Sequence, residues 1–127
     1  MGKILSYEDL DVYEKALDLQ QEVFEISKGF PAEERYSLTD QVRRASRSIG
    51  ANIAEAWSKR RYTAHFVSKL TDSDGEQNET RHWLLSAFRC GYLSEQDFNR
   101  LTETCREVGS KLGAMIRQPT QWIPHDP

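Results

Sequence analysis

Apolar residues follow a period of three to four positions along four stretches of the chain, with a gap in the third over residues 71–82, and the four prolines all lie outside these stretches. This is the period of an α-helix with one apolar face, so the pattern predicts four helices over residues 7–27, 38–58, 62–90 and 95–118. Gly29-Phe30-Pro31 ends the first helix, and Gly91 ends the third. We expect residues 119–127, which contain three prolines, to form an extended tail.

The last predicted helix indicates how the helices pack. Its apolar residues follow a 3-4-3-4-3 spacing, typical of the seam of a left-handed bundle: Phe98, Leu101, Cys105, Val108, Leu112 and Met115. Because short connections make neighbouring helices antiparallel, the sequence predicts an all-α fold, an antiparallel up-down four-helix bundle over residues 1–118. Ser37 and Ser94 are expected to cap the second and fourth helices.

The first predicted helix carries two apolar stripes, although a bundle core needs only one. The stripes are Leu10, Tyr13, Leu17 and Phe24, and Val12, Ala16, Leu19, Val23 and Ile26. We interpret the surplus stripe as a subunit interface and predict a homo-oligomer. The alternative is that the C-terminal tail covers this stripe, docked by Trp122 and Ile123.

The charge of the chain is unevenly distributed. The 127 residues leave room for one domain, and a net charge of −3 argues against a surface that binds polyanions generally. By segment, however, the net charge is −6 over residues 1–40, +5 over 41–61 and −2 over 62–127. The sequence shows neither a signal peptide nor an apolar run long enough to span a membrane. We therefore expect a soluble, cytoplasmic protein with a basic island in its middle.

The basic island is the best candidate for a binding function. It comprises Arg43, Arg44, Arg47, Lys59, Arg60 and Arg61. Arginines held on a rigid helix can contact phosphates in a bidentate manner, which predicts contact with RNA or DNA. In the alternative interpretation, these residues pair with the acidic face of the first helix, in the same subunit or in a neighbour.

The second helix also carries a polar line, made of Gln41, Ser48, Asn52 and Glu55. The third helix has no large apolar residue between residues 71 and 82. Folding back at the turn places these segments opposite each other, with Ser48 near Asp72 and Ser73 and Gln41 near Glu79. We predict a hydrogen-bonded polar layer there. The alternative is a solvated face with a helix kink at Gly75.

Motifs for catalysis or metal binding are weak. Glu79 and His82 form an ExxH pair, but di-iron bundles need two such pairs, and neither His65 nor His125 has a glutamate three residues earlier. No nucleophile motif or glycine-rich phosphate loop is present. Cys90 and Cys105 are too far apart for a CxxC pair and are interpreted as packing residues. The sequence thus predicts no enzymatic activity, no metal and no cofactor.

Residues 34–55, ERYSLTDQVRRASRSIGANIAE, resemble the signature of small bacterial four-helix-bundle proteins that were first met in intervening sequences of 23S ribosomal RNA genes. The accessory variability determinant proteins of diversity-generating retroelements are similar at a greater distance. The resemblance implies a bundle that is commonly a homopentamer without known catalytic activity. The retroelement relatives bind nucleic acid and a reverse transcriptase through a basic surface. The motif residues here are Gln41, Arg43, Arg44, Ser48, Asn52, Ile53, Ala54 and Glu55.

Two functions follow from the sequence. The first is a non-enzymatic, oligomeric adaptor that contacts RNA or DNA weakly through the arginines of the second helix. The second is a structural or protein-binding oligomer in which the same arginines form salt bridges between subunits. Steep weakening of binding with added salt would distinguish the first from the second.

Overall fold

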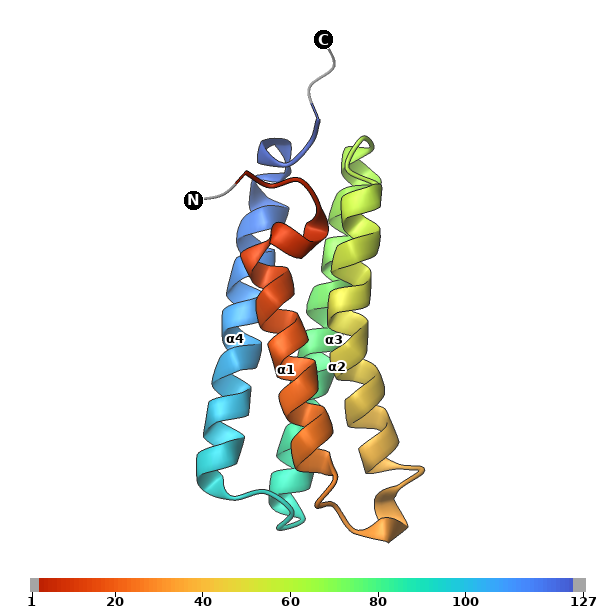
Figure 1. Cartoon of the computed structure of the whole chain (residues 1–127), viewed down its shortest axis with the longest axis vertical. Helices are drawn as coiled ribbons and strands as arrows, with labels where there is room; N and C mark the ends of the chain where they lie inside the picture. The colour runs from red at the N-terminus through yellow and green to blue at the C-terminus, as the bar shows by residue number, and fades with distance from the viewer. Residues whose placement is uncertain (1–2, 125–127) are drawn as a thin grey trace.

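The computed structural model describes residues 3–124, which form four α-helices and no strand. The helices are α1 (Asp11–Ser27), α2 (Leu38–Ser58), α3 (Thr63–Arg89) and α4 (Glu95–Arg117). Figure 1 shows the chain running down α1, up α2, down α3 and up α4, so that consecutive helices are antiparallel. Each helix packs against two others, since α1 and α3 both contact α2 and α4. The predicted all-α fold is confirmed.

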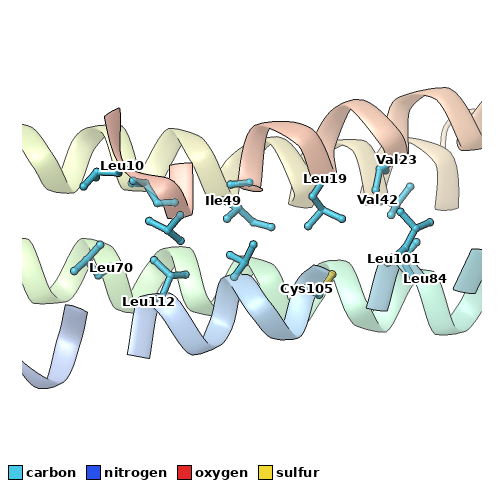
Figure 2. Packing of buried hydrophobic residues seen from close by; sticks show 14 of the residues in the cluster. Leu10, Leu19, Val23, Val42, Ile49, Leu70, Leu84, Leu101, Cys105 and Leu112 are labelled. Carbon is cyan, nitrogen blue, oxygen red and sulfur yellow. The ribbon is translucent and has the colours of Figure 1, made fainter. Parts of the chain in front are cut away.

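The core lies along the axis of the bundle and receives side chains from all four helices (Figure 2). Burial of each large apolar side chain contributes about 1.5–3 kcal/mol to folding. The predicted seam of α4 is confirmed, with Phe98 half-buried at its start and the other residues buried. The largest apolar side chains with less than 2% exposure are Phe66, Leu19, Ile49, Ile53, Leu70, Leu84, Leu101, Leu112, Val23, Val42 and Val108.

The first helix begins later than the sequence predicts. Ser6 and Asp9 cap each other in a separate 3-10 turn, Tyr7–Asp9, and the backbone of Leu10 is then extended with φ −74° and ψ 130°. The helix α1 therefore starts at Asp11 and not at residue 7. A local capping box, which satisfies its own backbone donors, has interrupted a continuous apolar pattern.

The predicted cap of α2 is wrong, whereas that of α4 is confirmed. The Ser37 hydroxyl donates to Glu34 Oε1 at 2.6 Å and makes no capping bond to α2, while the amide of Leu38 donates to the same carboxylate. At α4, Ser94 Oγ accepts from the amide of Asp97 at 3.0 Å. A carboxylate from the preceding turn has replaced the hydroxyl at the start of α2.

The tail does not stay extended after Arg117. Residues Pro119–Gln121 form a 3-10 turn, and Trp122 then packs edge-on against Trp57 of α2, with ring centroids 6.2 Å apart. The stripe with Val12, Ala16, Leu19 and Val23 is buried in the core, so the surplus stripe of α1 is the one that contains Leu17. Leu17 remains 39% exposed, so the tail does not cover this part of the stripe. Residues 125–127 of the predicted tail, including His125, lie outside the described residues.

The third helix is continuous through Gly75, which the structure places in the middle of α3. This glycine is exposed, and a β-carbon added to it would meet no atom within 4 Å. The helix is therefore not broken at Gly75. Of the helices in residues 3–124, none combines the length and the apolar character that a membrane crossing requires.

A candidate interaction surface on α2

Three arginines from the first half of α2 line an open hollow of about 460 Å³ on the surface of the bundle. Arg35, in the turn before α2, contributes a fourth guanidinium, and Asp40 contributes one carboxylate. We call the four arginines, Arg35, Arg43, Arg44 and Arg47, the arginine face. The hollow is completed by Thr39, Asp40, Ser48 and Ala51.

Arg43 is held in place by α1. Its Nε donates to Ser27 Oγ at 2.7 Å, and its guanidinium carbon lies 4.8 Å from the centre of the Phe24 ring. Ser27 is itself only 2% exposed. A guanidinium fixed by a buried hydroxyl and an aromatic ring loses little further freedom when it binds an anion.

Arg47 lies over the same ring one turn further along α2. Its guanidinium carbon is 5.6 Å from the centre of the Phe24 ring, and its side chain is exposed. Throughout residues 3–124, no carboxylate lies within 4.0 Å of the charged nitrogens of Arg43 or Arg47. Both positive charges are thus available to a partner.

Arg44 differs because α3 neutralises it. It forms ion pairs with Glu76, at 3.4 Å, and with Glu79. Glu79 also accepts a hydrogen bond from the indole of Trp83 at 3.2 Å. This arginine joins α2 to α3, and its charge is matched inside the chain.

The remaining basic residues of the island lie at the other end of α2. Lys59, Arg60 and Arg61 are about 20 Å along the helix from Arg47. The Arg60 guanidinium covers the Trp57 ring at 3.7 Å and donates to the carbonyls of Trp57 and Trp122. Burial lowers the pKa of Arg60 below its usual value. Lys59 is half-buried and Arg61 exposed, so the six residues do not form one surface.

Charged side chains of α1 form ion pairs with α4, and none of the ion pairs in residues 3–124 joins α1 to α2. Lys15 of α1 bonds Glu107 at 2.9 Å, and Arg100 of α4 approaches Glu22 of α1 at 3.6 Å. Asp11 pairs with Lys111, and a hydrogen bond from that lysine lowers the pKa of the Asp11 carboxyl. Within one chain, therefore, the acidic face of α1 does not neutralise the arginine face.

The predicted polar line of α2 forms bonds with partners other than those expected. Ser48 Oγ donates to the carbonyl of Arg44, and Asn52 Nδ2 donates to the carbonyl of Ser48, both within α2. Gln41 is half-buried at the start of the line. Glu55 pairs with Lys69 of α3 at 3.2 Å, while Glu79 pairs with Arg44 instead of Gln41. Within the described residues, this line is joined to α3 by the Glu55–Lys69 ion pair and not by amide or hydroxyl bonds.

Polar side chains from the middle of α3 are nevertheless buried. Ser73 Oγ donates across the helix interface to the carbonyl of Ile49 at 2.8 Å, in place of the expected contact with Ser48. Gln77 is 4% exposed and lies against Gly109 of α4, where an added β-carbon would be 2.8 Å from Gln77 Nε2. Thr80, fully buried, bonds back to the carbonyl of Glu76. Glycine at position 109 is what gives the amide of Gln77 its space.

No metal site is present among residues 3–124, because no three histidine, cysteine or acidic side chains are placed to share an ion. His82 lies edge-on to Trp83 with ring centroids 4.8 Å apart, while Glu79 is engaged with Arg44. Cys105 is buried, and this burial raises the pKa of its thiol to about 12, so it remains protonated. Cys90 is exposed.

Two residues of the surface around the arginine face were not predicted from the sequence. Charge counting by segment assigns Arg35 to the acidic stretch 1–40, although it lies beside Arg43 and Arg44. Phe24 belongs to the surplus apolar stripe of the first helix, but it lies under Arg43 and Arg47. The antiparallel topology could have indicated the position of Phe24, because the end of α1 must lie beside the start of α2.

Comparisons with known proteins agree with this fold. Residues 8–114 match the family model described as "23S rRNA-intervening sequence protein". A crystal structure from Bacteroides thetaiotaomicron, of a protein with unknown function from the S23 ribosomal protein family, is similar with a TM-score of 0.77. The two chains are 28% identical, and the match covers 84% of this chain and 96% of the other. A search of curated proteins gives no match.

Proposed function

This chain belongs to the family of 23S rRNA-intervening sequence proteins, and from that premise we propose that it is a non-enzymatic, homo-oligomeric adaptor that contacts RNA or DNA through the arginine face of α2. The observation that carries the proposal is the pair formed by Arg43 and Arg47. Both guanidiniums lie over Phe24, and neither has a carboxylate partner within residues 3–124. Two ordered, unneutralised charges one helical turn apart suit consecutive phosphates.

Binding through this surface is weak for a single chain. The net charge of −3 opposes a polyanion, and Arg44 is already paired with Glu76 and Glu79. In an oligomer, several copies of the arginine face act on one nucleic acid, and the effective concentration of the second and later contacts raises the affinity. The predicted oligomer and the predicted nucleic-acid contact therefore support each other.

The test is a salt titration with labelled RNA hairpins and DNA duplexes of equal length. The Arg43→Gln/Arg47→Gln variant removes two phosphate contacts, so the slope of log affinity against log salt, which is negative, should become shallower by roughly 1.5 per chain. The matched control is Lys15→Gln/Lys111→Gln, which changes the net charge equally but on the α1–α4 side. No retention of either nucleic acid at low ionic strength, or equal slopes for the two variants, contradicts the proposal.

The alternative is a structural or protein-binding oligomer in which Arg43 and Arg47 pair with acids of a neighbouring subunit. It is favoured by the exposed part of α1, where Leu17 lies between the acids Glu14 and Asp18. Light scattering after size exclusion separates the two functions. Dissociation of the Arg43→Ala/Arg47→Ala variant into monomers supports the structural oligomer, whereas an intact oligomer that has lost nucleic-acid binding supports the adaptor.

A further inference from the structure

A second surface hollow, of about 380 Å³, lies between α3 and α4. Its lining repeats with the helical period on both sides, at positions 78, 81, 82 and 85 of α3 and 98, 102 and 106 of α4. The hollow therefore extends along the two helices, and we call it the α3–α4 groove. It shares no residue with the arginine face.

The floor of the groove is apolar. Leu85 is 42% exposed, one of the few large apolar side chains that the fold leaves open to solvent. Phe98 is half-buried beside it, and its ring stacks on Phe88 with centroids 4.6 Å apart and an angle of 13° between the planes. This stacking holds the Phe98 ring in one orientation at the floor of the groove.

Cationic side chains flank this floor on both helices. Arg81 of α3 is half-buried, and its side chain makes no ion pair or hydrogen bond within the described part of the chain. Arg106 of α4 reaches only Glu103 of its own helix, at 3.7 Å. Both guanidiniums lie close enough to Cys105 to oppose, in part, the rise that burial causes in the pKa of its thiol. Two positive charges therefore converge on one strip of surface, with the exposed His82 beside them.

We propose that the α3–α4 groove binds an acidic amphipathic helix of another protein. A third helix laid along two helices places apolar side chains at intervals of three and four residues, which matches the floor at Leu85 and Phe98. Glutamates or aspartates beside those apolar residues would reach Arg81 and Arg106. Arg81 is half-buried without a carboxylate partner in residues 3–124, and Arg106 has only Glu103 of its own helix, so both can form such charge-assisted pairs.

The same features disfavour a nucleic acid in this groove. Single strands bind through aromatic rings open for base stacking, whereas Phe98 already stacks on Phe88. Because the arginine face and the groove lie on different helices, failure of one proposal leaves the other intact.

The probe is a fluorescein-labelled, designed helical peptide of about 15 residues, with leucines three and four apart and glutamates on both sides of them. Fluorescence anisotropy should show binding to the full chain. Leu85→Glu should weaken it at least about tenfold, because a charge enters the apolar floor, and Arg81→Gln at least about threefold. The matched controls, Tyr62→Glu before α3, where the side chain is 62% exposed, and Lys15→Gln on α1, should leave the affinity within about twofold of the original.

Each other outcome of this experiment overturns the proposal. The groove does not select acidic helices if a peptide with lysines in place of the glutamates binds equally well, or if the acidic peptide does not bind. Displacement of the peptide by a short single-stranded RNA would assign the groove to nucleic acid instead. A change of oligomeric state in Leu85→Glu, with an unchanged thermal transition, would assign it to a second copy of this chain.

Discussion

The two ends of α2 carry similar charges in opposite environments. Near its start, Arg43 and Arg47 lie over one phenylalanine of α1 and face solvent without a carboxylate partner in residues 3–124. Just beyond its end, Arg60 is clamped between the Trp57 ring and the carbonyl of Trp122. The first environment keeps the charge accessible, whereas the second uses the guanidinium as a packing and hydrogen-bonding group.

This difference shows that positive charge on a helix does not by itself define a binding surface. An arginine contributes a flat, weakly hydrated group that can serve as packing material as well as a phosphate ligand. At the end of α2, the Arg60 guanidinium packs on Trp57 and bonds the carbonyl of Trp122, which holds the tail against the bundle. At the start of α2, α1 orders Arg43 and leaves its charge unmatched.

The largest effect is expected from Trp57→Ala. The variant should lose about 2–3 kcal/mol of unfolding free energy, because Trp57 supports both the Arg60 guanidinium and the Trp122 ring. Urea unfolding followed by circular dichroism measures this. The control is Tyr36→Ala at the other end of α2, where the side chain is 85% exposed and the change should stay within about 0.5 kcal/mol. Equal losses of unfolding free energy in the two variants would show that the two ends of α2 do not differ in this way.

A smaller difference in unfolding free energy is expected between variants of Arg60 and of Arg47. Arg60→Gln should cost about 1–2 kcal/mol of unfolding free energy, since it removes a cation–π contact and two bonds to carbonyls. Arg47→Gln, measured in the same way, should cost less than about 0.5 kcal/mol, because Arg47 contacts only the Phe24 ring from an exposed position. If Arg47→Gln is the more destabilising variant, this end of α2 is a structural element and not an open surface.

The smallest expected effect is on the pH dependence of the unfolding free energy, to which the two ends of α2 should contribute differently. Before α2, Glu34 accepts hydrogen bonds from Ser37, Tyr92 and Leu38, and the bond from Ser37 is the main cause that lowers its pKa below the usual 4.5. A carboxyl whose pKa is lower in the folded state stabilises the fold above its unfolded pKa and loses this contribution as the pH falls through the folded one.

Glu34→Gln should therefore reduce the difference in unfolding free energy between about pH 7 and pH 3, and Arg60→Gln should leave that difference as it is. Asp11 and Asp97 also have lowered pKa values, so the Glu34→Gln variant keeps part of the acid sensitivity. Thermal unfolding at both pH values measures the change. An unaltered pH dependence in Glu34→Gln would show that this carboxylate does not stabilise the start of α2.

Local patterns were sufficient for most of the fold. The period of apolar residues located all four helices, and the Ser94 cap and the seam of α4 followed from spacing alone. The errors arose where a short-range side-chain bond competed with the pattern. The Ser6–Asp9 capping box shortened the first helix, and Glu34 engaged the hydroxyl of Ser37. Two packed tryptophans folded the tail back.

The candidate site was predicted only as a set of residues. Sequence reasoning selected Arg43, Arg44 and Arg47, but it joined them to Arg60 about 20 Å away and left out Arg35. Which arginine is neutralised depends on the rotation and register of α3, which bring Glu76 and Glu79 to Arg44 and not to Arg47. The apolar period does not specify these quantities to within one residue.

The sequence by itself determined the number of helices, their order and the faces that form the core, because the free energy of apolar burial depends on a pattern repeated along each helix. Only the tertiary structure decided which charges meet. Ion pairs and cation–π contacts act over a few ångströms between residues distant in the chain, so their partners are fixed by how the helices pack. That packing places Arg43 and Arg47 over Phe24 without a carboxylate partner in residues 3–124. It places Arg60 against Trp57 and the carbonyl of Trp122 in the tail.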